Sequence, residues 1–526
     1  MKILVADKIA EEGVEYLRQQ EGLEVIFKTG LSADELSREI ADVEGLIIRS
    51  AVTITSEVLK AAPRLKVIGR AGIGVDNIDM EAATEQGVVV LNTPDANATT
   101  TAELALAQLF SLSRNLPAAD RSVREGKWER SKFIGAEITG KTIGIVGYGT
   151  IGRIMASRCL GLKMQVLAYD PFVTREVFEA DGVEPRDLDD MLPELDYLTL
   201  HCPLIEKTRN LINAERLKKM KPEARIINCA RGGLIDEVAL LDAVRGGHLA
   251  GAALDVYAQE PPIGSPLLEE EKIVFTPHLG ASTTEAQRAA GTEIAKQVAD
   301  YLLRGEAINA LNVPFVPGEE LTRIRPYQNL ARKLGCLLAA LAQEPIDRME
   351  VTLSGRAAEV DPHPVAVEAL VGVLSAQLSQ SVNSVNACYL AKRQGISLIE
   401  TRDETIHDYL SLVTVEGFSQ NDSIRIVGTL LGERQPRLVR IGDYEVEAVP
   451  EGVLLITWHE DRPGVVGALG DVLGRAHVNI TRMHVGDSTT EDTAIAVIGV
   501  SSLLNDGQMA MVAGIPAIHK VFQVTL

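Results

Sequence analysis

The stretch that decides the fold is Lys141-Thr142-Ile143-Gly144-Ile145-Val146-Gly147-Tyr148-Gly149-Thr150-Ile151-Gly152. The apolar run 142–146 predicts a buried strand, and residues 151–160 have the pattern of a helix. Between them, Gly147 permits a tight turn, Gly149 lets backbone approach a pyrophosphate, and Gly152 lets the helix pack closely on the strand. Because a helix N-terminus attracts phosphate charge, the stretch predicts a dinucleotide-binding unit.

The residue that ends the next strand predicts which dinucleotide binds. The apolar run 165–169 stops at Asp170, 23 residues after Gly147. An acid at this place binds the ribose hydroxyls and repels a 2′-phosphate. We therefore expect NAD as the cofactor, and we predict no metal site.

Three chemically useful residues follow later predicted strands. Arg231 follows the run 225–229, Glu260 follows 254–257, and His278 follows 273–276. Ligands of open α/β sheets bind beyond the carboxyl ends of the strands. Each residue alone is more simply interpreted as a loop charge or a core histidine, but together they form a set suited to oxidising a 2-hydroxy acid.

The chemistry of such an oxidation assigns each member of the set a role. A histidine near neutral pKa accepts the hydroxyl proton, so His278 is the predicted acid/base. A carboxylate on the other ring nitrogen orients the base, which suits Glu260. Arg231 is then the anchor for the substrate carboxylate and the polariser of the carbonyl.

Strand and helix signals alternate on both sides of this unit and predict parallel sheets. We expect a discontinuous substrate-binding lobe over 1–97 and 283–312. Residues 1–97 lack a glycine fingerprint, so this lobe should not bind the nucleotide. The strand–helix alternation ends with the helix after Ser282, and nothing after that helix continues the second sheet, so the helix should pack on the first lobe. The NAD-binding Rossmann domain is predicted over 98–282. Within it, Thr100 and Glu103 suggest a capping box for a helix over 99–113, and 121–134 is predicted to be irregular.

The rest of the chain predicts two further domains. Residues 319–447 mix helices with β-rich runs, as in an α+β domain. Residues 452–526 have the order βαββαβ, which is the ferredoxin-like motif. The expected fold class is thus α/β, with two Rossmann-like or flavodoxin-like lobes followed by two α+β domains.

Composition limits the function classes. The chain has 526 residues and a formal net charge of −21, which disfavours a general nucleic-acid or anionic-membrane binder. Its five cysteines form no C-x-x-C pair, which favours a reduced, cytoplasmic setting. We find no signal peptide and no apolar run long enough to span a bilayer.

Residues 1–312 resemble the D-2-hydroxyacid dehydrogenase family, through the glycine run and the segments 201–204, 228–236, 255–261 and 277–278. The resemblance implies a two-lobed enzyme with the active site in the cleft and the same roles for Arg231, Glu260 and His278. It implies an NAD site lined, besides the three glycines, by Thr150, Ile151, Asp170, His201, Pro203, Thr208, Cys229, Ala230, Asp255, Gly280 and Ala281.

The segments 49–50, 70–79 and 97–103 resemble the branch of this family that oxidises 3-phospho-D-glycerate to 3-phosphohydroxypyruvate, the first step of L-serine biosynthesis. The implied substrate contacts are Arg49, Arg70, Gly72, Asn97, Arg130 and Lys132. Cationic side chains suit a small trianionic substrate in an acidic protein. Arg130 and Lys132 are interpreted equally well as charges of a solvated loop.

Residues 453–526 resemble an ACT domain, through the segments 458–466 and 477–480. The resemblance implies that His459, Asp461 and Asn479 hold an amino acid, L-serine, between paired domains; a dimerisation role alone is the alternative. Residues 319–447 resemble the intervening domain of the long phosphoglycerate-oxidising enzymes. Arg437 and Arg440 in this segment could bind an anion, but we favour their interpretation as solvated charges on strands. We expect a homo-oligomer, either a dimer or a tetramer.

Two other functions compete with this one. A glyoxylate or hydroxypyruvate reductase would share the first 312 residues but would usually lack a sensor-like tail. A non-catalytic NAD or amino-acid sensor would not need a proton-transfer base such as His278.

Overall fold

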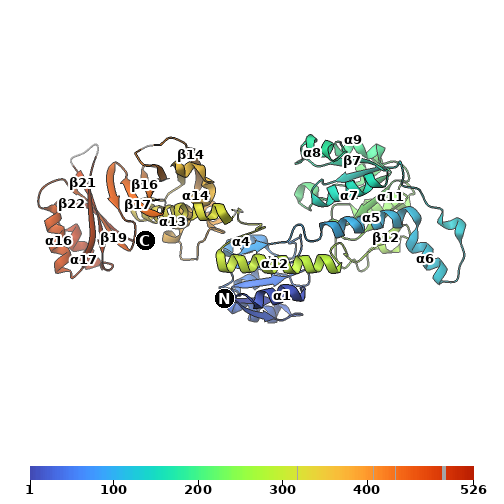
Figure 1. The fold of residues 1–526 in the computed structure, drawn as a ribbon, viewed down its shortest axis with the longest axis horizontal. Coiled ribbons are helices and arrows are strands. Elements are labelled where there is room, and N and C mark those ends of the chain that lie inside the picture. The colour runs from blue at the N-terminus through green and yellow to red at the C-terminus, as the bar shows by residue number, and fades with distance from the viewer. Residues whose placement is uncertain (315, 317, 407, 433, 489–492) are drawn as a thin grey trace.

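A computed structural model describes residues 1–314, 316, 318–406, 408–432, 434–488 and 493–526. These residues form four sheets, two in each half of the chain (Figure 1). The predicted fold class is confirmed: two lobes have parallel sheets, the third sheet is mixed, and the fourth is antiparallel with the ACT order of elements.

The first lobe is built on a parallel sheet in the order β2-β1-β3-β4-β5. Its strands are β1 (Lys2–Val5), β2 (Glu24–Phe27), β3 (Gly45–Ile48), β4 (Val67–Arg70) and β5 (Val89–Leu91). Its own helices are α1 (Glu11–Arg18), α2 (Ala33–Glu39), η1 (Ile40–Asp42), α3 (Ser56–Lys60) and α4 (Met80–Gln86).

A helix from much later in the chain, α12 (Thr284–Arg304), covers one face of this first sheet. Its Ile294 and Val298 share a buried core with Ile3 and Val67. The close crossing of α12 and α1 depends on two glycines, since a Cβ on Gly13 would lie 2.4 Å from the carbonyl oxygen of Gly291. Packing of apolar side chains therefore brings residues beyond 283 back to the first lobe.

The second lobe has a parallel sheet in the order β12-β11-β10-β9-β6-β7-β8. Its strands are β6 (Thr142–Val146), β7 (Gln165–Tyr169), β8 (Glu184–Pro185), β9 (Tyr197–Leu200), β10 (Arg225–Asn228), β11 (Gly251–Leu254) and β12 (Ile273–Phe275). Its helices and turns are α5 (Ala98–Arg114), α6 (Leu116–Arg124), η2 (Arg130–Phe133), α7 (Thr150–Gly161), α8 (Arg175–Ala180), α9 (Leu188–Met191), η3 (Leu192–Glu194), η4 (Glu206–Thr208), α10 (Ala214–Lys219), α11 (Glu237–Arg245) and η5 (Pro266–Glu269). The strand order reverses between β6 and β9, which creates a crevice at their carboxyl ends.

The second half of the chain carries a mixed and an antiparallel sheet. The mixed sheet has the order β14-β13-β15-β16-β17-β18, and the antiparallel sheet has the order β20-β21-β19-β22. Their strands are β13 (Arg348–Gly355), β14 (Ser397–Asp403), β15 (Ser411–Phe418), β16 (Ser423–Leu431), β17 (Gln435–Ile441), β18 (Tyr444–Ala448), β19 (Val453–Glu460), β20 (Ile480–Asp487), β21 (Thr493–Val500) and β22 (Ile518–Thr525). The helices are α13 (Gly318–Leu341), η6 (Arg356–Glu359), α14 (Pro362–Gln377), α15 (Ala387–Gln394), α16 (Val465–Arg475) and α17 (Asp506–Ala513).

Two local predictions are wrong. Helix α5 begins at Ala98 with Asn97 at its N-cap, so Thr100 and Glu103 form no capping box. Thr100 instead lies with its hydroxyl oxygen 3.2 Å from that of Thr283, a tertiary partner that local sequence does not reveal. Residues 121–134 are not irregular throughout, because α6 extends to Arg124 and a 3-10 turn follows.

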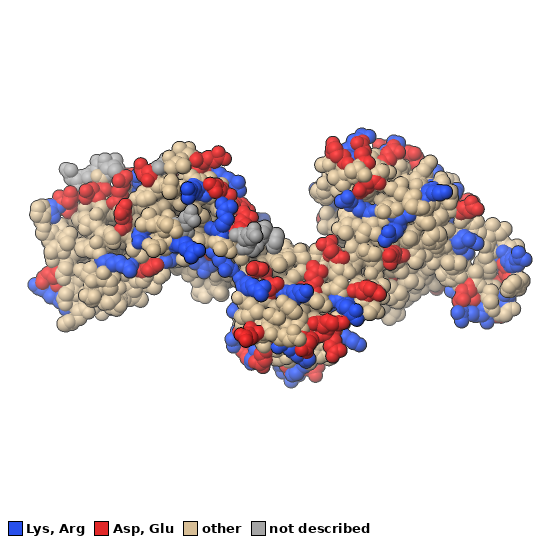
Figure 2. Space-filling model, viewed as in Figure 1, with Lys and Arg blue, Asp and Glu red and all other residues tan. Residues whose placement is uncertain are grey.

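On the face shown in Figure 2, Lys and Arg side chains are interspersed with Asp and Glu rather than gathered into one broad patch. The acidic net charge is thus distributed over the visible domains. None of the helices in the described ranges combines the length and the apolarity needed to cross a bilayer.

Candidate active site

A cavity of about 240 Å³ lies where the carboxyl ends of β6, β9 and β10 meet the first lobe. It is lined by Arg70, Ile73, Gly74, Asp76, Asn97, Thr101, Ile151, His201, Cys202, Pro203, Cys229, Ala230, Arg231, His278, Gly280 and Ala281. Both lobes contribute side chains, and the cavity is at the crevice created by the reversal of strand order.

The glycine turn after β6 has the geometry of a phosphate cradle. Gly147 has φ +91°, and a Cβ there would lie 2.7 Å from the backbone of His201. A Cβ on Gly152 would lie 2.1 Å from the carbonyl oxygen of Gly147. Around Gly149 the space is open, so a ligand can approach its backbone at the start of α7.

Asp170 ends β7 beside this turn. Its carboxylate accepts hydrogen bonds from the backbone N–H groups of Tyr148 at 2.8 Å and Phe172 at 2.9 Å. These bonds hold the acid next to the glycine cradle. Its place fits contact with the ribose of a bound dinucleotide.

His278 and Glu260 form a hydrogen-bonded pair at the cavity. The distance from His278 Nδ1 to Glu260 Oε2 is 2.7 Å, and the backbone N–H of Tyr257 donates to the other carboxylate oxygen. The hydrogen bond to Glu260 raises the pKa of His278 above its ordinary 6.5, against burial, which lowers it. Burial raises the pKa of Glu260, but the bonds from His278 and Tyr257 outweigh it and the net pKa is lowered.

Arg231 reaches the same cavity from the loop after β10. Its Nε lies 3.1 Å from a carboxylate oxygen of Asp76 in the first lobe, and one of its terminal nitrogens donates to the carbonyl of Ala230. The guanidinium lies directly over Gly74, where an added Cβ would be 2.0 Å from a guanidinium nitrogen. A small residue at 74 is therefore required for Arg231 to lie there.

Arg70 adds a second cation, half-buried like Arg231. Burial, with the nearby positive charges of Arg231 and Arg49, lowers the pKa of Arg70 to about 10. Arg49 does not line the cavity; its guanidinium donates to the carbonyl of Lys8. Gly72, at φ +139°, gives Arg70 room because a Cβ there would be 1.8 Å from its guanidinium.

Among the residues that the structure describes, three buried polar atoms of the cavity lining have no hydrogen-bond partner: His201 Nδ1, Arg70 Nε and Asn97 Oδ1. The other ring nitrogen of His201 lies 3.0 Å from the Thr199 hydroxyl, and burial lowers the pKa of His201 to about 4, so the ring stays neutral. Unpaired buried polar groups are costly, so the cavity is suited to a polar ligand. Together with the glycine cradle, these residues fit a dinucleotide and a small acid.

The structure brings most of the sequence-predicted residues together, but not all of them. Thr150 lies at the first turn of α7, Thr208 bonds within its own loop, and Asp255 lies behind the cavity, bonded to the His278 loop. Sequence reasoning missed Ile73, Gly74, Asp76, Thr101 and Cys202 as lining residues. All five lie within the segments 70–79, 97–103 and 201–204 that carry the family resemblance, and that was the signal available for them.

Arg130 and Lys132 are not brought to the cavity of their own chain. Both are exposed on the 3-10 turn η2, next to α6, which projects from the side of the second lobe (Figure 1). Their surroundings match the solvated-loop alternative.

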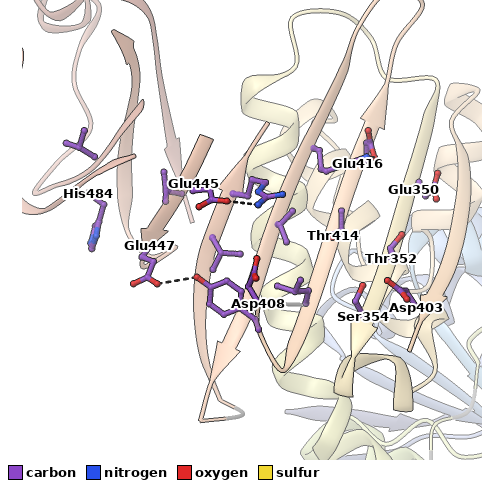
Figure 3. A pocket seen from close by; sticks show the side chains of 18 of the residues that line it. Glu350, Thr352, Ser354, Asp403, Asp408, Thr414, Glu416, Glu445, Glu447 and His484 are labelled. Carbon is purple, nitrogen blue, oxygen red and sulfur yellow. Dashed lines mark hydrogen bonds and ion pairs between the residues drawn. The ribbon is translucent and has the colours of Figure 1, made fainter. Parts of the chain in front are cut away.

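A second cavity, of about 1110 Å³, lies between the mixed sheet and β20 (Figure 3). Among the residues lining it, carboxylates outnumber arginines; the carboxylates are Glu350, Asp403, Asp408, Glu416, Glu445 and Glu447. The two lining arginines, Arg425 and Arg440, are paired with Glu416 and Glu445 at 3.0 and 2.7 Å. This lining disfavours an anion there.

Of the predicted effector residues, His459 and Asp461 lie just before α16, whereas Asn479 follows that helix and lies beside Ser501 at the other end of the sheet. Asp461 and Asn479 are exposed, while His459 on β19 is buried. His459 Nδ1 lies 3.0 Å from the carbonyl oxygen of Glu460, and its Nε2 has no hydrogen-bond partner within the described part of the chain. Gly464, at φ +99°, begins α16 without a side-chain cap, which leaves backbone N–H groups for a ligand.

Comparisons with known proteins agree with this geometry. Residues 106–280 match the family described as D-isomer specific 2-hydroxyacid dehydrogenase, NAD binding domain. A solved protein from Thermus thermophilus is 35% identical with a TM-score of 0.54, over 59% of this chain and 100% of that one. A glyoxylate reductase from Paecilomyes thermophila is 28% identical with a TM-score of 0.54, over 59% and 98%. The fold and site of the first half are those of an NAD-dependent D-2-hydroxyacid dehydrogenase.

The second half and the full-length relatives narrow the assignment. Residues 323–442 match the D-3-phosphoglycerate dehydrogenase intervening domain, and 453–505 match the ACT domain. The D-3-phosphoglycerate dehydrogenase of Synechocystis sp. is 42% identical over 100% of this chain and 95% of its own length. That of Methanocaldococcus jannaschii is 39% identical over 100% of both. The chain belongs to the D-3-phosphoglycerate dehydrogenase family.

Proposed function

We propose that this chain oxidises 3-phospho-D-glycerate to 3-phosphohydroxypyruvate with NAD, as the first step of L-serine biosynthesis. The observation that carries the proposal is the 2.7 Å hydrogen bond between His278 and Glu260, beside Arg231 in a cavity that both lobes line. The relatives named D-3-phosphoglycerate dehydrogenase, which match the full length of this chain, support this substrate over other 2-hydroxy acids.

In the proposed mechanism, His278 Nε2 accepts the proton of the substrate hydroxyl. Glu260 holds the proton on Nδ1 and stabilises the imidazolium as it forms. Gly147, Gly149 and the start of α7 would hold the pyrophosphate of NAD, which would supply the hydride acceptor.

The cations of the cavity bind the anionic substrate. Arg231 contacts the carboxylate and the reacting oxygen, because its planar fork fits both. Arg70 and Arg49 supply further positive charge from the first lobe, and Asn97 supplies a polar contact at the start of α5. Asp76 holds Arg231 in the absence of substrate, through the ion pair at 3.1 Å.

The test is NADH formation from 3-phospho-D-glycerate at alkaline pH with a trap for the keto product, for the natural chain and for His278→Ala. We expect turnover only in the natural chain, with NADH binding retained in the variant. Reduction of glyoxylate or hydroxypyruvate, with no reaction of the phosphorylated acid, would support the reductase alternative. NADH binding without turnover on any acid would support the sensor.

We propose L-serine as the effector, bound by His459, Asp461 and Asn479 between paired ACT domains. The unpartnered Nε2 of His459 and the uncapped start of α16 support this site. L-serine at millimolar concentration is expected to lower the rate of the natural chain, and Asn479→Ala is expected to weaken that effect. A rate indifferent to L-serine would leave the domain an assembly role.

We also propose that the protein is a homo-oligomer in the cytoplasm. The arm 116–134, which contains α6 and η2, exposes apolar side chains, with Trp128 79% and Ile134 80% exposed. Such an apolar surface is typical of an interface. Sedimentation of the natural chain and of Trp128→Glu tests the assembly; a monomer in both would contradict it.

A further inference from the structure

A chain of buried hydrogen bonds leads from helix α5 to the loop that carries His278. Gln108 Nε2 donates to the Thr276 hydroxyl oxygen at 3.0 Å, and that hydroxyl donates to Asp255 Oδ1 at 2.6 Å. Gln108 is 3% exposed and Asp255 is fully buried. Because the amide occupies the acceptor side of the hydroxyl, the hydroxyl hydrogen is directed at the carboxylate.

Asp255 in turn holds the loop on both sides of the catalytic base. Its carboxylate accepts the backbone N–H groups of Leu279 at 2.7 Å and Gly280 at 2.9 Å, and its backbone carbonyl accepts the N–H of His278 at 2.9 Å. His278 has φ +53°, a left-handed conformation that a residue with a Cβ seldom adopts. The surrounding bonds must therefore maintain it.

The charge of Asp255 depends on the same donors. Burial raises the pKa of this carboxyl, while Thr276, Leu279 and Gly280 lower it by hydrogen bonding to the charged form. The charged groups that act on His278 are Glu260, Asp255 and Arg231. Loss of the Thr276 hydroxyl would thus favour protonation of Asp255 and loosen the His278 loop.

We propose that Gln108 and Thr276 are positioning residues for the reaction: through Asp255 they hold the loop that aims His278 at the substrate. This inference rests on the proposed acid/base role of His278. It assigns a task to two residues that are not among the predicted substrate or cofactor contacts, and one of them lies on the helix that connects the two lobes.

The test compares the pH dependence of kcat for reduction of 3-phosphohydroxypyruvate by NADH in Thr276→Val, Thr276→Ser and Gln108→Met. In this direction His278 must be protonated, so deprotonation of His278 lowers kcat on the alkaline side of the pH profile. The acid limb of the profile is then free to report the protonation of Asp255. Thr276→Val is expected to lower kcat at neutral pH by about tenfold and to move the acid limb to higher pH. Gln108→Met should lower kcat and shift the acid limb to a smaller degree. Thr276→Ser, which keeps the hydroxyl, should have the kcat and the acid limb of the natural chain.

The matched control is Ser113→Ala, which removes a buried hydroxyl on α5. This hydroxyl donates to the Leu109 carbonyl and lies 2.8 Å from the Tyr197 hydroxyl. It is expected to leave the acid limb in place. NADH affinity and the melting temperature verify that each variant is folded.

An unmoved acid limb in folded Thr276→Val, or a shift of equal size in Ser113→Ala, would overturn the inference. If the natural chain reduces only another keto acid, the proposed substrate fails and the same profiles, run with that acid, still decide the positioning role. Inactivity on every keto acid would overturn both.

Discussion

At the residue scale, one carboxylate raises the pKa of the proposed base, and one arginine is the proposed anchor of the substrate carboxylate. Glu260 raises the pKa of His278, and Arg231 is held between Asp76 and the carbonyl of Ala230. The raised pKa of His278 and the position of Arg231 both depend on short contacts. Substitutions that keep either the size or the charge of a side chain therefore distinguish the effect of its charge from that of its geometry.

Glu260→Gln removes the charge and keeps the size. Because the carboxylate raises the pKa of His278, the variant should have a lower His278 pKa. Oxidation needs the neutral imidazole, so its rate rises with pH through this pKa; the acid limb of kcat/KM should move to lower pH while the plateau falls. The profile of the NADH-forming reaction checks this. A limb that moves to higher pH would contradict the assigned pairing.

Arg231→Lys keeps the charge but loses the planar fork. Hydrogen bonds to charged groups contribute roughly 1.5–3 kcal/mol, so kcat/KM for the phosphorylated acid should fall at least about tenfold. NADH affinity should change little. Arg245→Lys, an arginine paired at 3.7 Å with Glu270 outside the cavity, is the control. Similar losses in both variants would argue against a substrate anchor at 231.

At the scale of elements, the loop after β4 and the loop after β10 meet only because glycine leaves room. The backbone at Gly74 needs no left-handed conformation, and the obstacle to a side chain is the Arg231 guanidinium. The first-lobe loop thus sets the position of a second-lobe cation.

Gly74→Ala tests this contact. A Cβ 2.0 Å from a guanidinium nitrogen must displace Arg231, so the KM for the substrate should rise several-fold with NADH affinity unchanged. Gly161→Ala, at a helical position with open space around it, should leave both constants unaltered. Steady-state kinetics and NADH fluorescence measure the two effects. An unchanged KM in Gly74→Ala would show that the loops after β4 and β10 can accommodate the added methyl group without displacing Arg231 from the substrate.

At the scale of the whole molecule, the second half of the chain contacts the first lobe at the C-terminal end of α4. Asn383 donates to the carbonyl of Gly87 at 2.8 Å, and Asn386 donates to that of Glu85 at 3.2 Å. Both carbonyls lie at the end of α4, and the loop that contains Gly74 and Asp76 precedes α4. Domain docking and the site are therefore linked through one short helix.

Asn386→Leu tests the docking contact. Asn386 is 1% exposed, so its loss leaves buried partners unsatisfied and should cost about 1–3 kcal/mol in free energy of unfolding. Urea denaturation followed by circular dichroism measures it. Asn421→Ala, at an exposed asparagine, should cost less than about 0.5 kcal/mol. Equal effects would mean that the contact contributes nothing to docking.

The sequence by itself determined the elements and motifs whose causes are local. The glycine spacing of 147–152 requires a strand, a turn and a helix, and the βαββαβ order of the tail follows from its apolar periodicity. Arg231, Glu260 and His278 were predictable because each follows its own strand, and parallel strands end at one edge of a sheet.

Only the tertiary structure decided what depends on residues distant in the chain. The start of α5 near Thr283, the pairing of Arg231 with Asp76, and the bond between Gln108 and Thr276, 168 positions apart, have no local signal. Side-chain packing between elements selects these partners, and a one-dimensional pattern records the periodicity of each element but not which faces meet. For that reason the sequence predicts the chemistry of the site, whereas the folded chain sets its geometry.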